Sequence, residues 1–172
     1  MIGYVLYVIF FVLCICYLLE GWNTEKAHLR SVSSLVCTRR EIGTYALSLG
    51  NLVISLIAFR ADSANAWIIY LAGQGVISFF LDTCPIIHHV FLAIYITSLL
   101  AFASHVCEDN ASLWVHSYPL FVLSVFFSAA VIVNNTCAEY TYLSTQAILE
   151  LFWILSFVYF LNIYEKSYTL TV

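Results

Sequence analysis

Charged side chains are scarce in this chain of 172 residues. Only 9% of the residues are Asp, Glu, Lys or Arg, against about 25% in an average soluble domain, and 63% are hydrophobic. A chain of this size cannot bury so much apolar surface inside a core surrounded by water. The shortage of charge therefore excludes an ordinary soluble domain and indicates an integral membrane protein with lipid as its solvent.

The motifs of common catalytic and cofactor sites are also missing. The sequence contains no Cys-x-x-Cys pair, no glycine-rich phosphate loop, no dinucleotide-binding glycine pattern and no Ser-His-Asp order. We therefore expect no cofactor, and we favour a non-enzymatic function over an enzymatic one. The expected partners are membrane lipids and other membrane or membrane-associated proteins, and no nucleic acid.

Long apolar runs fill nearly the whole chain, separated by short polar segments. A transmembrane helix needs about 20 mostly apolar residues at about 1.5 Å per residue. The sequence predicts an all-α fold, a polytopic membrane helical bundle forming a single domain over 1–172. Its six transmembrane helices are expected near 2–19, 42–59, 66–81, 86–106, 113–133 and 142–163. The first run lacks the basic start and the cleavage site of a signal peptide, so we interpret it as a retained helix.

Small residues within the predicted spans indicate where helices approach closely. Ala46 and Gly50 lie four residues apart in the second span, and Gly73 and Gly75 flank a glutamine in the third. Small side chains let helix backbones meet inside lipid, so both sets predict packed interfaces.

Glu150 is the clearest charged residue inside a predicted span. A charged side chain at the centre of a bilayer costs about 2.5–3.5 kcal/mol on insertion scales, so it needs an explanation. Gln146, one turn earlier, shares its helix face and can hydrogen-bond to it. Glu150 is either a functional carboxylate, for protons or lipid headgroups, or a group that locks the helix to its neighbours, and we favour the second interpretation.

A second polar cluster lies at the turn between the third and fourth spans, where Asp82, Thr83, His88 and His89 surround Pro85. Asp82, His88 and His89 are weak candidates for a metal site, because the two histidines are adjacent and point about 100° apart on a helix. Capping of the fourth span by Asp82 or Thr83, with Pro85 in its first turn, explains most of the cluster.

Different features of the sequence favour opposite orientations in the membrane. Four basic residues in the first loop favour an N-terminus outside the cytosol, because basic loops stay cytoplasmic: Lys26, Arg30, Arg39 and Arg40. Two glycosylation sequons, at Asn110 and Asn134, fall on opposite sides, so only one of them would be used. With the N-terminus in the cytosol, Cys37, Cys84 and Cys137 all face the lumen, where two of them can form a disulfide.

Three stretches resemble the damage-regulated autophagy modulator (DRAM) family, with its FRAG and Sfk relatives. Residues 37–60, with Asn51 and Arg60, are similar to the entry, the Leu-Asn pair and the closing Arg of the family's second helix. Residues 80–93 are similar to its Phe-Gln-Glu-Thr segment and following histidine, which falls on His89. Residues 147–170 are similar to its Glu-Trp helix and exit, with Glu150 as the acid, although Leu151 replaces the Trp.

The resemblance implies six spans with both termini in the cytosol, which we adopt over the charge argument. It also implies a non-enzymatic modulator that promotes autophagy and lysosomal function through lipid or protein partners, in lysosomes or endosomes. Golgi or plasma membrane is the alternative location. The alternative functions are lipid handling, by remodelling of GPI lipids or regulation of phosphoinositides, and a structural subunit of a membrane assembly or viral envelope.

Overall fold

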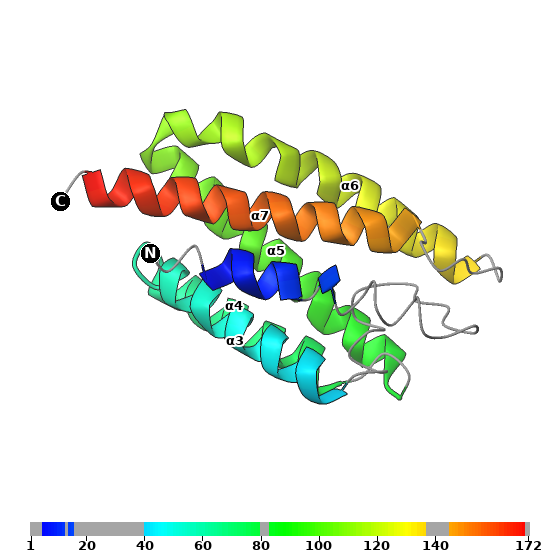
Figure 1. Ribbon diagram of the computed structural model, residues 1–172. Helices are drawn as coiled ribbons and strands as arrows, with labels where there is room; N and C mark the ends of the chain where they lie inside the picture. Colours follow the sequence, from blue (N-terminus) through cyan, green and yellow to red (C-terminus); the bar gives the residue numbers. More distant parts are fainter. Residues whose placement is uncertain (1–4, 13, 16–39, 80–82, 137–144, 171–172) are drawn as a thin grey trace.

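The structure, a computed structural model, describes residues 5–12, 14–15, 40–79, 83–136 and 145–170, and within these ranges its regular elements are all helices (Figure 1). Residues 5–12 and 14–15 are helical. The other elements are α3 (Arg40–Ala58), α4 (Ser63–Ser78), α5 (Pro85–Asp109), the 3-10 turn η1 (Ala111–Leu113), α6 (Trp114–Thr136) and α7 (Thr145–Leu170). The predicted all-helical bundle is confirmed for this part of the chain, and α3 to α7 each begin within three residues of a predicted span.

Three helical stretches in the described part of the chain are long and apolar enough to cross a membrane. They are Pro85–Asp109, Ala111–Val131 and Gln146–Ser167, while Gly43–Ala58 is a shorter apolar helix. The predicted total of six membrane crossings stays a prediction. The last of the three stretches is the most deeply packed, with 44% of its most apolar window buried, against 33% and 22% in the other two.

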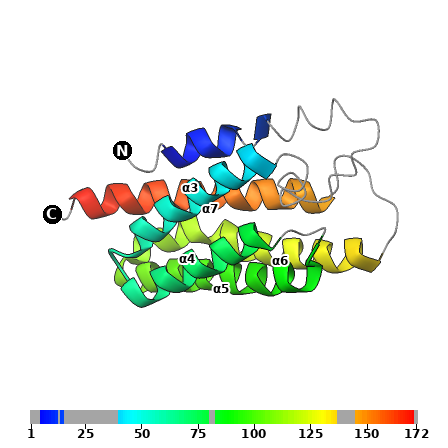
Figure 2. The ribbon, with the colours of Figure 1, turned by 90° about the horizontal axis from the view of Figure 1, so that it is seen from below.

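The helices run alternately up and down the bundle. The α3–α4 connection, the η1 turn and the end of α7 lie at one end, and the beginnings of α3, α5 and α7 lie at the other (Figure 1). The closest neighbours are α3 with α4, α4 with α5, and α6 with α7. The helix at 5–12 lies beside α3 and α7 in both views (Figure 2).

Local sequence sets where the helices begin. The Asp62 carboxylate caps α4 by accepting from the Asn65 backbone N–H at 3.0 Å. Pro85 occupies the first turn of α5 as predicted, where its missing N–H costs nothing. The predicted cap of this helix by Asp82 or Thr83 was wrong, because the N-cap position is taken by Cys84, whose side chain makes no capping bond.

The glycines of α4 permit its close contacts, as predicted for this helix. A Cβ at Gly73 would fall within 2.6 Å of the Asn51 side chain of α3, and one at Gly75 would overlap the ring of Phe91 in α5. Gly50 in α3 is different, because a Cβ there would meet Ile9 at 3.6 Å, an ordinary contact. Gly73 and Gly75 therefore fix how closely α4 approaches its two neighbours.

Apolar side chains lie on the outside of the bundle as well as in its hydrophobic core. The exposed face of α3 is an apolar stripe spaced by three or four residues, which Phe59 continues just beyond the helix: Tyr45, Leu49, Leu52 and Leu56. The interior face of the same helix holds Asn51 and Ser55, which are 3% and 7% exposed. α7 repeats the stripe with Ile148, Phe152, Leu155 and Tyr159. Such continuous exposed apolar surface marks contact with a membrane or another protein.

Candidate functional site

Asn51 connects α3 to α4 at the point where Gly73 makes room for it. Its Nδ2 donates to the Tyr70 carbonyl oxygen at 3.0 Å, and Ser55 Oγ donates to the backbone oxygen of Asn51 at 2.8 Å. The Asn51 Oδ1 atom is buried and has no hydrogen-bond partner. A buried acceptor without a hydrogen bond is costly, and this one packs against Gly73, where no side chain intervenes.

Trp153 connects α7 to α6 in the same manner. Its indole Nε1 donates to Ser124 Oγ at 2.7 Å, and that hydroxyl in turn donates to the Leu120 carbonyl oxygen at 2.7 Å. The Trp153 ring stacks on Phe157 with 5.5 Å between ring centroids. The indole is 6% exposed, so this hydrogen bond lies inside the bundle.

A cavity of about 140 Å³ lies between the helix at 5–12 and all five long helices. Its walls are mainly apolar and include Leu6, Ala46, Leu92 and Ile154. Four side chains with polar atoms also line it: Asn51, Tyr95, Glu150 and Trp153. Among its described lining residues none is basic, and Glu150 is the acidic one.

Glu150 lies on the inner side of α7, half-buried, and lines this cavity. Gln146, one turn earlier, is buried. The sequence prediction that the acid faces the neighbouring helices agrees with this position. The favoured interpretation, that Glu150 locks α7 to its neighbours, stays a prediction.

The histidine cluster predicted around Pro85 separates into the buried His88 and the half-buried His89. His88 is 3% exposed, and its Nδ1 lies 2.8 Å from the Phe79 carbonyl oxygen at the end of α4. His89 Nδ1 contacts the Pro85 carbonyl oxygen of its own helix at 2.7 Å. Asp82 lies outside the described residues. His88 therefore ties the end of α4 to the beginning of α5, and no group of three metal-binding side chains is found among the residues that the structure describes.

The described residues include only some of the predicted glycosylation and disulfide positions. Asn110 lies in the turn between α5 and η1, where its Oδ1 accepts from Ser112 Oγ at 2.7 Å. The backbone of Asn134 belongs to the end of α6. Cys84 has a free thiol. Since Cys37 and Cys137 lie outside the described residues, a disulfide between those two stays a prediction.

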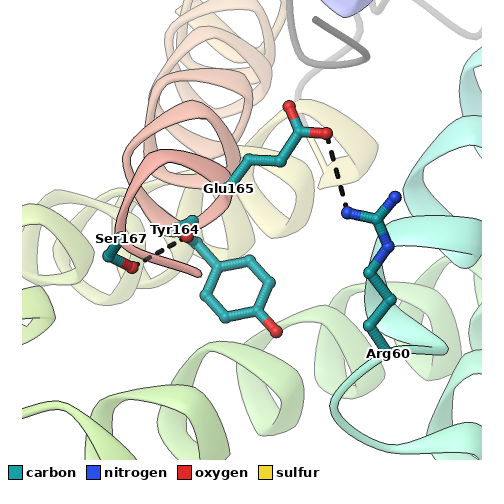
Figure 3. Close-up of polar contacts among 4 residues, drawn as sticks. All are labelled: Arg60, Tyr164, Glu165 and Ser167. Atoms are coloured by element: carbon teal, nitrogen blue, oxygen red, sulfur yellow. Dashed lines mark hydrogen bonds and ion pairs between the residues drawn. The ribbon is translucent and has the colours of Figure 1, made fainter. Parts of the chain in front are cut away.

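At the opposite end of α7, an ion pair that the sequence analysis missed joins two distant segments. Arg60 Nη1, just beyond α3, lies 3.9 Å from Glu165 Oε1, and Figure 3 shows the two side chains pointing toward each other. Tyr164 packs its ring edge-on against Phe102 of α5, with centroids 5.6 Å apart. The predicted spans alternate in direction, which places Arg60 and Glu165 at the same end of the bundle. This alternation could have predicted that the two residues lie close together.

Comparison with known proteins gives no family assignment. Neither the protein-family models, nor the curated proteins, nor the solved structures include a match to this chain. The structure defines a bundle of antiparallel helices, and within the described residues three helical stretches are long and apolar enough to cross a membrane.

Proposed function

We propose that this chain is a six-span membrane protein that acts without catalysis and promotes autophagy in lysosomes or endosomes through lipid or protein partners. The observation that carries the membrane setting is the apolar surface that the helices expose. Apolar stripes face outward on α3 and α7, while Asn51, Ser55 and Gln146 are buried. In water such stripes would be exposed at a large cost, whereas in lipid they are solvated.

The polar contacts support a role without catalysis. Asn51, Trp153 and His88 each contact a group on a neighbouring element, at Tyr70, Ser124 and Phe79. Asn65 of α4 likewise donates to the Ser98 carbonyl oxygen of α5 at 3.0 Å. Hydrogen bonds between helices stabilise membrane bundles, so these groups have a structural explanation.

Residues from the three stretches that resemble the family lie around one internal cavity. Asn51 and Glu150 both line it, and so does Leu92, which stands where the family has Gly. The same cavity favours lipid handling as the second candidate function, because its walls are mostly apolar and it includes one carboxylate.

The proposal is tested by replacing Glu150 in cells. We expect Glu150→Ala to lower the abundance of the protein, its sorting to lysosomes or endosomes and the degradation rate of an autophagy reporter together, because the acid lies among the packed helices. Glu108→Ala, at an exposed position near the end of α5, is the matched control and should behave as wild type. Normal abundance and sorting of Glu150→Ala would contradict a locking role, and a reporter rate that does not depend on the wild-type protein would contradict the function.

A further inference from the structure

The central cavity lies between two groups of helices. The closest helix pairs are α3 with α4, α4 with α5, and α6 with α7, and the cavity is lined from both groups. Its volume of about 140 Å³ is close to the roughly 150 Å³ apolar cavity known to admit benzene, so about six carbon atoms fit. An empty space of this size forfeits van der Waals contacts along its walls, and a hydrocarbon ligand would restore them.

The wall of the cavity is mainly hydrocarbon. Asn51 and Glu150 add polar atoms to it, and the Asn51 carboxamide is directed at Tyr70 and Gly73 on α4. No Lys, Arg or His belongs to the described lining residues, so an anionic headgroup would find no cation there. Each of the six helices that reach the cavity contributes apolar side chains, among them Ile9, Leu47, Val76, Leu92, Phe127 and Ile154.

The cavity lies at mid-depth of the helices that are long enough to cross a membrane. On its α5 wall, Tyr95 is about 15 Å and about 21 Å along the helix axis from the two ends of Pro85–Asp109. On its α7 wall, Ile154 is about 12 Å and about 20 Å from the two ends of Gln146–Ser167. The hydrocarbon core of a bilayer is about 30 Å thick, so its midplane, where the acyl chains end, is about 15 Å from either boundary. The part of a bilayer lipid that lies level with the cavity is therefore the methyl end of an acyl chain.

We propose that this cavity binds the methyl end of an acyl chain of a bilayer lipid. The chain enters past Leu92, Ile96 and Ile154, which line the cavity and are only half-buried. Its last carbons pack against the buried rings of Phe127 and Trp153, while the headgroup stays at the membrane surface. The inference deepens the proposed function, rests on its membrane setting, and names the part of the lipid that is bound.

Trp153 provides the reporter for a test, because it lines the cavity and is only 6% exposed. Its fluorescence is measured in a full chain whose other three tryptophans, Trp22, Trp67 and Trp114, are replaced by phenylalanine. The chain is placed in nanodiscs of phosphatidylcholine that has bromine near the methyl end of one acyl chain, because bromine quenches tryptophan at short range. The reference is the same chain with Phe152→Trp and Trp153→Phe, which moves the indole by one residue onto the exposed stripe of α7.

We expect the methyl-end bromine to quench Trp153 at least half as strongly as it quenches the reference indole. A buried indole would otherwise be shielded from lipid by the helices around it. Phosphatidylcholine with bromine next to the ester carbonyl should quench Trp153 less, because that part of the chain stays near the membrane surface. Quenching of Trp153 by the methyl-end bromine that is less than half of the reference value would overturn the proposal.

Substitutions at Ala46 separate a chain end inside the cavity from chains outside the bundle. Ala46→Leu and Ala46→Phe add increasing bulk to the cavity wall and should lower the quenching of Trp153 stepwise, by about twofold for the larger side chain. Leu49→Phe adds bulk to the exposed stripe of α3 instead and should leave the quenching unchanged. The smaller Ala46→Leu keeps the test decisive if the larger side chain prevents folding. Quenching that neither Ala46 variant lowers would overturn the proposal.

The failure of this proposal and that of the proposed function are distinguishable. If the methyl-end bromine did not quench the reference indole, the outer stripe of α7 would not face lipid, and the membrane setting of the proposed function would be lost as well. Strong quenching of the reference with weak quenching of Trp153 would remove the cavity site alone. The sorting and reporter results of Glu150→Ala are measured in cells and would stand in that case.

Discussion

Arg60 and Glu165 form an ion pair with 3.9 Å between Nη1 and Oε1, and it joins the end of α3 to the last turns of α7. The arginine side chain is 40% exposed and the glutamate side chain 10%. The pair therefore fixes two segments at the same end of the bundle, as Figure 3 shows.

We predict that this ion pair makes a modest contribution to stability that depends on salt. In a double-mutant cycle with Arg60→Ala and Glu165→Ala, the coupling free energy should be about 0.2–1 kcal/mol, because the arginine remains partly in contact with water. The measurement is thermal unfolding in nanodiscs at low and high ionic strength. The charge-reversed double variant should recover part of the loss. A coupling of zero at low salt would show that the two side chains do not meet.

The glycines of α4 give a second prediction. Gly75→Ala should destabilise the bundle by about 1–3 kcal/mol, because its Cβ would overlap the Phe91 ring, which already stacks on Phe79. Gly50→Ala is the matched control on α3, where the added carbon would meet Ile9 at 3.6 Å, an ordinary van der Waals contact. It should be neutral or slightly stabilising, since alanine favours helix over glycine by about 1 kcal/mol. Equal effects of the two substitutions would argue against the α4–α5 contact.

The use of the two sequons reports orientation. If both termini are cytosolic, as the family resemblance implies, Asn134 should be glycosylated and Asn110 should not. Asn134→Gln should then abolish a glycosidase-sensitive mobility shift, and Asn110→Gln should leave it in place. The turn between α5 and η1, which contains Asn110, lies at the same end of the bundle as the α3–α4 connection and the end of α7 (Figure 1). A glycan on Asn110 would therefore place all three outside the cytosol.

Hydrophobic pattern alone located the helices well. The predicted run at 86–106 became α5 (Pro85–Asp109), and the run at 113–133 became η1 and α6. This succeeded because length and apolar content are local properties of the sequence. The prediction of close packing around Gly73 and Gly75 also depended only on residue size.

The partners across the bundle were harder to predict. Asn51 looked like one element of a family motif, and nothing in its neighbourhood shows that it meets Tyr70 and Gly73. The cap of α5 was assigned to Asp82 or Thr83 by propensity, but the backbone enters the helix later, at Cys84. Such contacts depend on how far each helix rotates and slides, which a single sequence does not encode locally.

The hydrogen bond from Asn51 to Tyr70 has a consequence for biosynthesis. The amide on α3 finds its acceptor only 19 residues later, on the next helix to leave the ribosome. Ser124 and Trp153 stand in a similar relation, with α7 emerging after α6. We therefore expect neighbouring helices to leave the translocation channel as hairpins and not singly, with each polar group shielded by its successor before either reaches hydrocarbon.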